Sequence, residues 1–153
     1  MKWKHPPITK IYEALGTVAD GRVEVSGNEA KVYSSSGNKF YNVKYSPDEN
    51  AIIANDNASY WIGYLGYPSI AFLLKIGVLK LRPEMANLLK GVKWKDINTK
   101  FKNDFAKALD SIESSLNLKD RKNLDEYVKL LDKAIAKMNL TVLGPKTKPP
   151  EGY

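Results

Sequence analysis

The chain has 153 residues and a formal net charge of +7, and 43% of its residues are hydrophobic. That content is enough to fill one packed core and excludes global disorder. The sequence contains no cysteine, which excludes disulfides, thiolate zinc sites and cysteine nucleophiles. No apolar run has the length of a membrane span or the pattern of a secretion signal, so we expect a soluble, cytoplasmic protein that does not bind membranes.

The first predicted element is a helix over residues 8–19. Pro6 and Pro7 suit the start of a helix, and Asp20-Gly21 offers a left-handed stop. Apolar side chains recur between them at helical spacing and define one face. These side chains are Ile8, Ile11, Tyr12, Leu15, Val18 and Ala19.

Four short strands follow, over residues 22–25, 29–33, 39–45 and 51–54. Ser26-Gly27-Asn28 is a hairpin turn signal between the first two. In the third strand Tyr41, Val43 and Tyr45 alternate with Phe40, Asn42 and Lys44, which indicates one buried and one exposed face. The pattern predicts an antiparallel four-stranded meander packed against the first helix.

The second half of the chain is predicted to be helical. Proline and glycine bracket residues 68–76 and 83–91 in the order expected of two short helices. A longer helix is then predicted over residues 94–116, with one apolar stripe. Its members are Trp94, Ile97, Phe101, Phe105, Ala108, Ile112 and Leu116.

The last predicted helix, within residues 118–140, has apolar residues at alternating spacings of four and three. They are Leu124, Val128, Leu131, Ile135 and Met138. A heptad seam of this composition favours a parallel two-stranded coiled coil, and so a homodimer. The alternative is packing of this helix on its own domain, because about two heptads make only a marginal zipper.

Aromatic residues are concentrated just before the basic part of the chain. The segment from Tyr60 to Tyr67 reads Tyr-Trp-Ile-Gly-Tyr-Leu-Gly-Tyr. The stretch from Lys75 to Lys107 then contains nine basic residues and three acidic ones. This stretch therefore holds +6 of the net +7. Rings that can stack on bases, next to cations that can neutralise phosphates, are the two parts of a single-strand nucleic-acid site.

We therefore expect a groove that binds single-stranded DNA, or RNA, with little sequence preference. The rings would contact bases and the cations would follow the phosphates, with Lys2 and Lys4 as additions. The expected binding residues are Tyr60, Trp61, Tyr64, Tyr67, Lys75, Lys80, Arg82, Lys90, Lys93 and Lys95. The alternatives are that the rings plug the end of the core and that the lysines form a solvated helix face.

The fold class expected is α+β, with a small four-stranded antiparallel sheet packed against several helices and a C-terminal dimerisation helix. Residues 1–117 would form the nucleic-acid-binding domain, residues 118–140 the dimerisation helix and residues 141–153 a flexible tail.

No catalytic pattern is evident in the sequence. His5 is the one histidine, and no metal-ligand spacing or phosphate-binding loop occurs. Asn55-Asp56-Asn57 could supply oxygen ligands to a hard cation, but turn formation and capping explain it better. The sequence predicts neither an enzyme nor a cofactor.

Several segments resemble the ThermoDBP-type single-stranded-DNA-binding proteins of hyperthermophilic archaea and their relatives. The residues behind this are Lys2-Trp3-Lys4-His5-Pro6-Pro7, Tyr12-Glu13-Ala14-Leu15-Gly16, and the stretch from Asn55 to Pro68. The resemblance covers about residues 2–140. It implies an archaeal α+β protein of DNA replication and repair, with an apolar cleft for bases flanked by basic groups and a C-terminal dimerising helix.

The chain has Tyr-x-Val-x-Tyr (Tyr41, Val43, Tyr45) in a hairpin, then a turn, and then a helix after Gly66-Tyr67-Pro68. This order is similar to the ββα layout of SWIM zinc fingers. The metal positions would be Ala54, Asp56, Ser69 and Ala71, which cannot bind zinc as a set. This resemblance implies a metal-free relative and gives the alternative function, a non-enzymatic module for protein–protein interaction.

Overall fold

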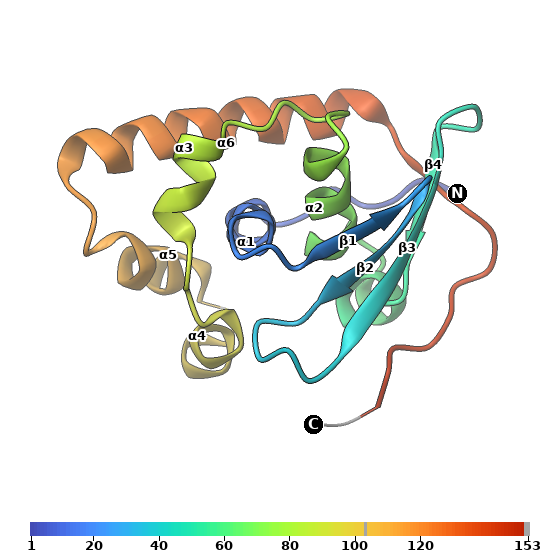
Figure 1. The fold of residues 1–153 in the computed structure, drawn as a ribbon, viewed down its shortest axis with the longest axis horizontal. Helices are drawn as coiled ribbons and strands as arrows, with labels where there is room; N and C mark the ends of the chain where they lie inside the picture. Colours follow the sequence, from blue (N-terminus) through green and yellow to red (C-terminus); the bar gives the residue numbers. More distant parts are fainter. Residues whose placement is uncertain (103, 152–153) are drawn as a thin grey trace.

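The computed structural model describes residues 1–102 and 104–151, and it has an α+β architecture with a sheet at one end and helices packed beside it (Figure 1). The strands are β1 (Val23–Ser26), β2 (Glu29–Tyr33), β3 (Phe40–Ser46), β4 (Ala51–Ala54) and β5 (Thr141–Val142). Their order in the sheet is β1-β2-β3-β4-β5. The alternation predicted for β3 is confirmed, since Tyr41, Val43 and Tyr45 are buried and the residues between them are exposed.

The sheet differs from the predicted one in its fifth strand, which pairs with β4 in parallel. Residues after α6 return to the edge of β4, where Thr141 N donates to Asn50 O at 3.0 Å and Leu143 N donates to Ile52 O at 3.1 Å. The prediction of a purely antiparallel, four-stranded sheet was therefore wrong. Thr141 and Val142, which the sequence pattern assigned to a flexible tail, form this fifth strand. A two-residue strand is too short to show an alternating pattern in the sequence.

The helical elements are α1 (Thr9–Ala19), η1 (Ala58–Ile62), α2 (Tyr67–Lys75), α3 (Pro83–Ala86), η2 (Asn87–Leu89), α4 (Trp94–Phe101), α5 (Phe105–Glu113) and α6 (Leu118–Met138). Figure 1 shows α1 end-on in the middle of the molecule, with α2 between it and the sheet and α6 along the top. Helix α1 packs on α2, α3, η2 and α6, so its apolar residues join the sheet side and the helix side into one core.

The single helix predicted over residues 94–116 is two helices, α4 and α5. Lys102 follows α4 with a φ of 44°, a left-handed conformation that ends the helix. Asp104 then caps α5, since its carboxylate accepts a hydrogen bond from Lys107 N at 3.1 Å. The predicted helix also includes residue 103, which lies outside the described residues.

The heptad seam of α6 lies inside this chain's own core. Leu124, Val128, Leu131 and Ile135 are buried together with residues of α1 and α2, and Met138 packs against the same cluster. The structure does not confirm the predicted dimer coiled coil, because the side chains of this seam already have intramolecular neighbours. Apolar residues at alternating spacings of three and four are also typical of a single helix that packs one face on a core.

None of the helices among residues 1–102 and 104–151 is long and apolar enough to cross a membrane.

Candidate nucleic-acid interface

A cleft of about 340 Å³ opens between α1, the β2–β3 loop, η1 and α4. Helix α1 and the β2–β3 region contribute Lys10, Glu13, Ser34, Ser35 and Tyr41 to its wall. The remaining wall residues are Asp56, Asn57, Ala58, Tyr67, Lys95, Asn98 and Thr99. The segments lie far apart in the sequence, so the cleft exists only in the folded chain.

The α1 wall carries an ion pair that is almost removed from solvent. Lys10 Nζ lies 3.2 Å from Glu13 Oε1, and the two side chains are 17% and 8% exposed. Asn98 of α4 donates to the same Glu13 oxygen at 3.4 Å, which ties α4 to α1. Burial lowers the pKa of Lys10, but the carboxylate of Glu13, followed by Tyr64 and Asp56, outweighs it and leaves the pKa above its ordinary value. The ammonium group is therefore held charged within the cleft.

Asp56 is a second buried carboxyl group of the cleft. Ser59 Oγ donates to Asp56 Oδ1 at 2.5 Å, and Ser59 N lies 3.4 Å from Oδ2. Burial raises the pKa of Asp56, while these hydrogen bonds and the charge of Lys10 oppose the shift. Gly66 is needed beside it, because a Cβ there would lie 2.0 Å from Asp56 Oδ2. Asp56 thus fixes η1 against the start of α2.

Two tyrosine rings line the cleft. Tyr41 and Tyr67 meet edge to face with their centroids 6.2 Å apart. Burial raises the pKa of Tyr67 well above its ordinary value, and the negative charge of Glu13 adds to the shift. The phenol of Tyr67 is therefore a neutral hydrogen-bonding group at all physiological pH values.

The other predicted rings surround η1, the turn that also supplies Asn57 and Ala58 to the cleft. Trp61 is 65% exposed and Tyr60 packs edge-on against it, with the centroids 4.7 Å apart. Tyr64 is half-buried, and it interacts electrostatically with Lys10. All four predicted aromatic residues are thus near one another, with Tyr67 inside the cleft and Trp61 facing solvent.

Two lysines from the ends of the chain lie beside this turn. The N-terminal segment pairs with it, since Lys4 N donates to Gly63 O at 3.0 Å and Leu65 N donates to Lys4 O at 3.1 Å. Lys4 Nζ lies 3.3 Å from Ile62 O. Lys146 Nζ lies 5.4 Å from the centroid of Trp3 and close to Gly63. Both cations therefore lie beside Ile62 and Gly63, the residues that follow Trp61 in the chain, and the sequence pattern assigned only Lys4 a role.

The basic residues predicted to accompany the rings fall into two groups. Lys75 is the last residue of α2, and Lys80 and Arg82 follow it, so the nine residues of α2 separate this group from η1 by about 13 Å. Arg82 forms an ion pair with Glu84 at 2.9 Å, and its guanidinium lies 5.6 Å from the ring centroid of Tyr127 on α6. The hydroxyl of Tyr127 donates to Lys80 O at 2.7 Å. Arg82 and the backbone of Lys80 therefore contact α6 through Tyr127.

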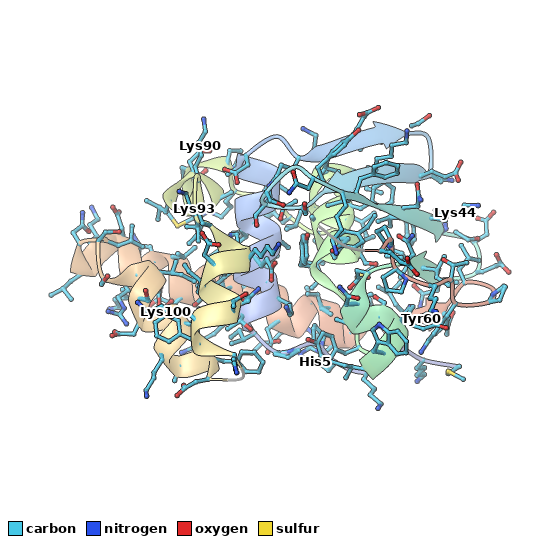
Figure 2. All side chains as sticks on the ribbon, turned by 90° about the horizontal axis from the view of Figure 1, so that it is seen from below. His5, Lys44, Tyr60, Lys90, Lys93 and Lys100 are labelled. Atoms are coloured by element: carbon cyan, nitrogen blue, oxygen red, sulfur yellow. The ribbon has the colours of Figure 1, made fainter. Side chains whose placement is uncertain are left out.

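The second group lies on the α4 side of the molecule. Lys95 lines the cleft, and its backbone N–H donates to Ser35 Oγ at 3.2 Å. Figure 2 shows Lys90, Lys93 and Lys100 on the α4 side, across α1 from the turn that carries Tyr60. Of the ten predicted binding residues, Tyr67 and Lys95 line the cleft itself.

His5 and the Asn55–Asn57 run serve the fold. His5 Nε2 lies 2.6 Å from Asp132 Oδ1 and connects the N-terminal segment to α6. Asn55 Oδ1 accepts a hydrogen bond from Asn42 N at 2.8 Å. Within residues 1–102 and 104–151, no three histidine, aspartate or glutamate side chains gather as metal ligands would.

Lys10, Glu13 and Asn98 were not among the residues predicted for the site. Glu13 lies on the opposite side of the predicted helix from its apolar face, so nothing in the pattern indicated that it is buried. No local sequence pattern indicated that α4 would form part of the cleft wall.

A family model covers nearly the whole chain. It matches residues 3–141 and is described as "Uncharacterised conserved protein UCP014422". The chain belongs to this family. No curated protein and no solved structure matched the chain. The matched region includes every residue of the cleft and all of the η1 turn.

Proposed function

We propose that this family member binds single-stranded nucleic acid, largely without sequence preference, over the cleft and the η1 turn. The observation that carries the proposal is Trp61, a large aromatic side chain left 65% exposed beside Tyr60 and within the same region as Lys4 and Lys146. If Trp61 served only the core, its ring would be buried, because an indole left in solvent does not gain the free energy of burying its apolar surface. A stacked base would cover it and add about 1–3 kcal/mol to binding.

The cationic groups around the turn support the same proposal. Lys4 and Lys146 lie beside Ile62 and Gly63 of the turn, and Lys95 lines the cleft together with Tyr67. Phosphates of a strand whose bases contact the turn would pass near these ammonium groups. Duplex nucleic acid should bind less well, because its base faces are stacked and unavailable.

Tryptophan fluorescence tests the proposal directly. Trp3 and Trp94 are buried, so Trp61 is the tryptophan that a base can reach. We expect a short oligodeoxythymidine to quench the fluorescence and a duplex of equal length to quench it less. Trp61→Phe should remove the quenching, while Trp61→Ala should weaken binding about tenfold.

Leu130→Ala is the matched control, because Leu130 is equally exposed, at 65%, on α6. Its affinity should equal that of the wild type. Equal affinities of Trp61→Ala and the wild type for the oligonucleotide would contradict the proposal.

A further inference from the structure

The cleft contains a carboxylate oxygen that the fold leaves without a side-chain donor. Glu13 accepts hydrogen bonds from Lys10 and Asn98, and both end at Oε1. Among the hydrogen bonds of the described residues, none reaches Oε2. Asp56 differs, since Ser59 engages both of its oxygens.

The size of the cleft suits one nucleotide. About 340 Å³ lies at the lower end of the range for small-molecule sites. The Tyr67 ring offers an aromatic contact, and the Asn57 amide offers a donor on the η1 side. The side chain of Lys95 lines the cleft and carries a positive charge that can attract a phosphate, whereas the charge of Lys10 is offset by Glu13. A base released from the strand at Trp61 would therefore meet groups that can read its edge.

The free carboxylate oxygen favours one base in particular. Carboxylates accept hydrogen bonds and cannot donate them, so they select bases that present donors. Guanine places two donors side by side, N1–H and the N2 amino group. Adenine and cytosine each present one amino donor next to an acceptor, and thymine presents one imino donor between two carbonyl groups.

We infer that the cleft is a subsite for a single guanine base, with Glu13 Oε2 as the acceptor for its N1–H and N2 amino donors. This inference rests on the proposed function where the guanine belongs to a strand. A free guanine nucleotide carries the same recognition edge, so the experiment includes both sources. Glu13 is then the specificity-determining residue in an otherwise sequence-tolerant binder.

Competition with base analogues tests the inference on the unmodified protein. Oligodeoxythymidines with one central substitution separate the two donors: guanine has both, hypoxanthine has only N1–H, 2-aminopurine has only the amino group, and adenine has neither. The guanine strand should bind at least about fivefold more tightly than the adenine strand, with the other two between them.

Glu13→Gln should abolish this ranking, because the amide oxygen stays with the donors Lys10 and Asn98 and its NH2 group is then turned toward the donors of the base. Glu126→Gln, at an exposed position on α6, is the matched control and should keep the ranking. Equal affinities for the four strands, with Trp61 quenching intact, would overturn the guanine subsite and leave the proposed function standing.

Guanosine monophosphate alone distinguishes the remaining outcomes. If it binds the wild type and not Glu13→Gln while no strand binds, the subsite is supported for a free nucleotide and the proposed function fails. If neither a strand nor guanosine monophosphate binds, both fail.

Discussion

Gly16 allows α1 to approach Trp94 closely. A Cβ at this position would lie 2.7 Å from Trp94 Nε1 and 3.2 Å from Leu89 O. Trp94 is 2% exposed, so its ring has no room to move aside. The close contact explains why a glycine stands inside a helix, where it costs about 1 kcal/mol relative to alanine.

We predict that Gly16→Ala destabilises the protein by about 1–3 kcal/mol, although helix propensity alone would make it stabilising. Denaturant unfolding measures the change. In a Trp94→Phe background the added methyl group no longer meets the indole nitrogen, so its cost should be smaller. A stabilised Gly16→Ala variant would show that the contact is loose.

Glu113 is buried between α5 and α6, next to the half-buried side chains of Asp125 and Arg121. Tyr12 donates to Asp125 Oδ1 at 2.5 Å, and Arg121 Nε lies 3.7 Å from Glu113 Oε1. Burial, followed by the neighbouring Asp125, raises the pKa of Glu113 to about 8. The folded chain therefore keeps a proton on this group that the unfolded chain releases near the ordinary value of 4.5.

This raised pKa predicts that stability falls as pH rises. Between the ordinary pKa and about 8 the folded state binds the extra proton, so the free energy of unfolding decreases by up to about 1.4 kcal/mol per pH unit. Glu113→Gln mimics the protonated group and should flatten this dependence, making the variant more stable than the wild type near pH 8. Unfolding titrations across the range measure both, and Glu126→Gln should retain the wild-type slope.

Local sequence patterns were sufficient to predict α1, β1 to β4 and α2, because each repeats one period between clear turn or capping residues. They failed where tertiary contacts decide the outcome. The Leu124–Met138 spacing fits a coiled coil and a core-facing helix equally well, and the surrounding core decides between them. The strand Thr141–Val142 forms because the edge of β4 is open to it.

The position of α6 predicts that its heptad residues stabilise the monomer fold. Leu131→Ala should cost about 2–5 kcal/mol, because it leaves a cavity in the core. Leu130→Ala changes the exposed neighbour and should stay within about 0.5 kcal/mol of the wild type. Unfolding by denaturant gives both values.

Protein concentration separates this arrangement from a zipper. A buried intramolecular seam gives a Leu131→Ala cost that is the same across about a hundredfold range of concentration. A cost that appears only at high concentration would indicate that the seam joins two copies.

For the whole molecule, the sequence indicated which kinds of residues form the candidate site, but not where in the fold the site lies. The rings of Tyr60, Trp61, Tyr64 and Tyr67 are local neighbours, so one segment revealed them. The cleft brings together Glu13, Ser34, Asp56 and Asn98, which no short pattern connects. Charge counted along the chain grouped Lys75 with Lys95, but α2 and α1 place them in different parts of the fold.

The separation of the basic residues predicts which of them bind phosphates. Lys4, Lys95 and Lys146 adjoin the η1 turn or the cleft, whereas Lys75, Lys80 and Arg82 lie at or past the other end of α2. Each phosphate contact with a single strand contributes about 0.7 to the slope of log affinity against log salt. Replacing the first three by glutamine should therefore reduce the slope by about 2.

The matched variant replaces Lys75, Lys80 and Arg82 by glutamine and removes the same net charge. Its slope should stay close to that of the wild type, since this group lies at the far end of α2 from the η1 turn and Arg82 packs on Tyr127 of α6. Oligodeoxythymidine titrations at several salt concentrations measure both slopes. Equal losses in the two variants would mean that the strand runs along α2 and over the whole molecule, and the η1 turn would then be one part of a longer path.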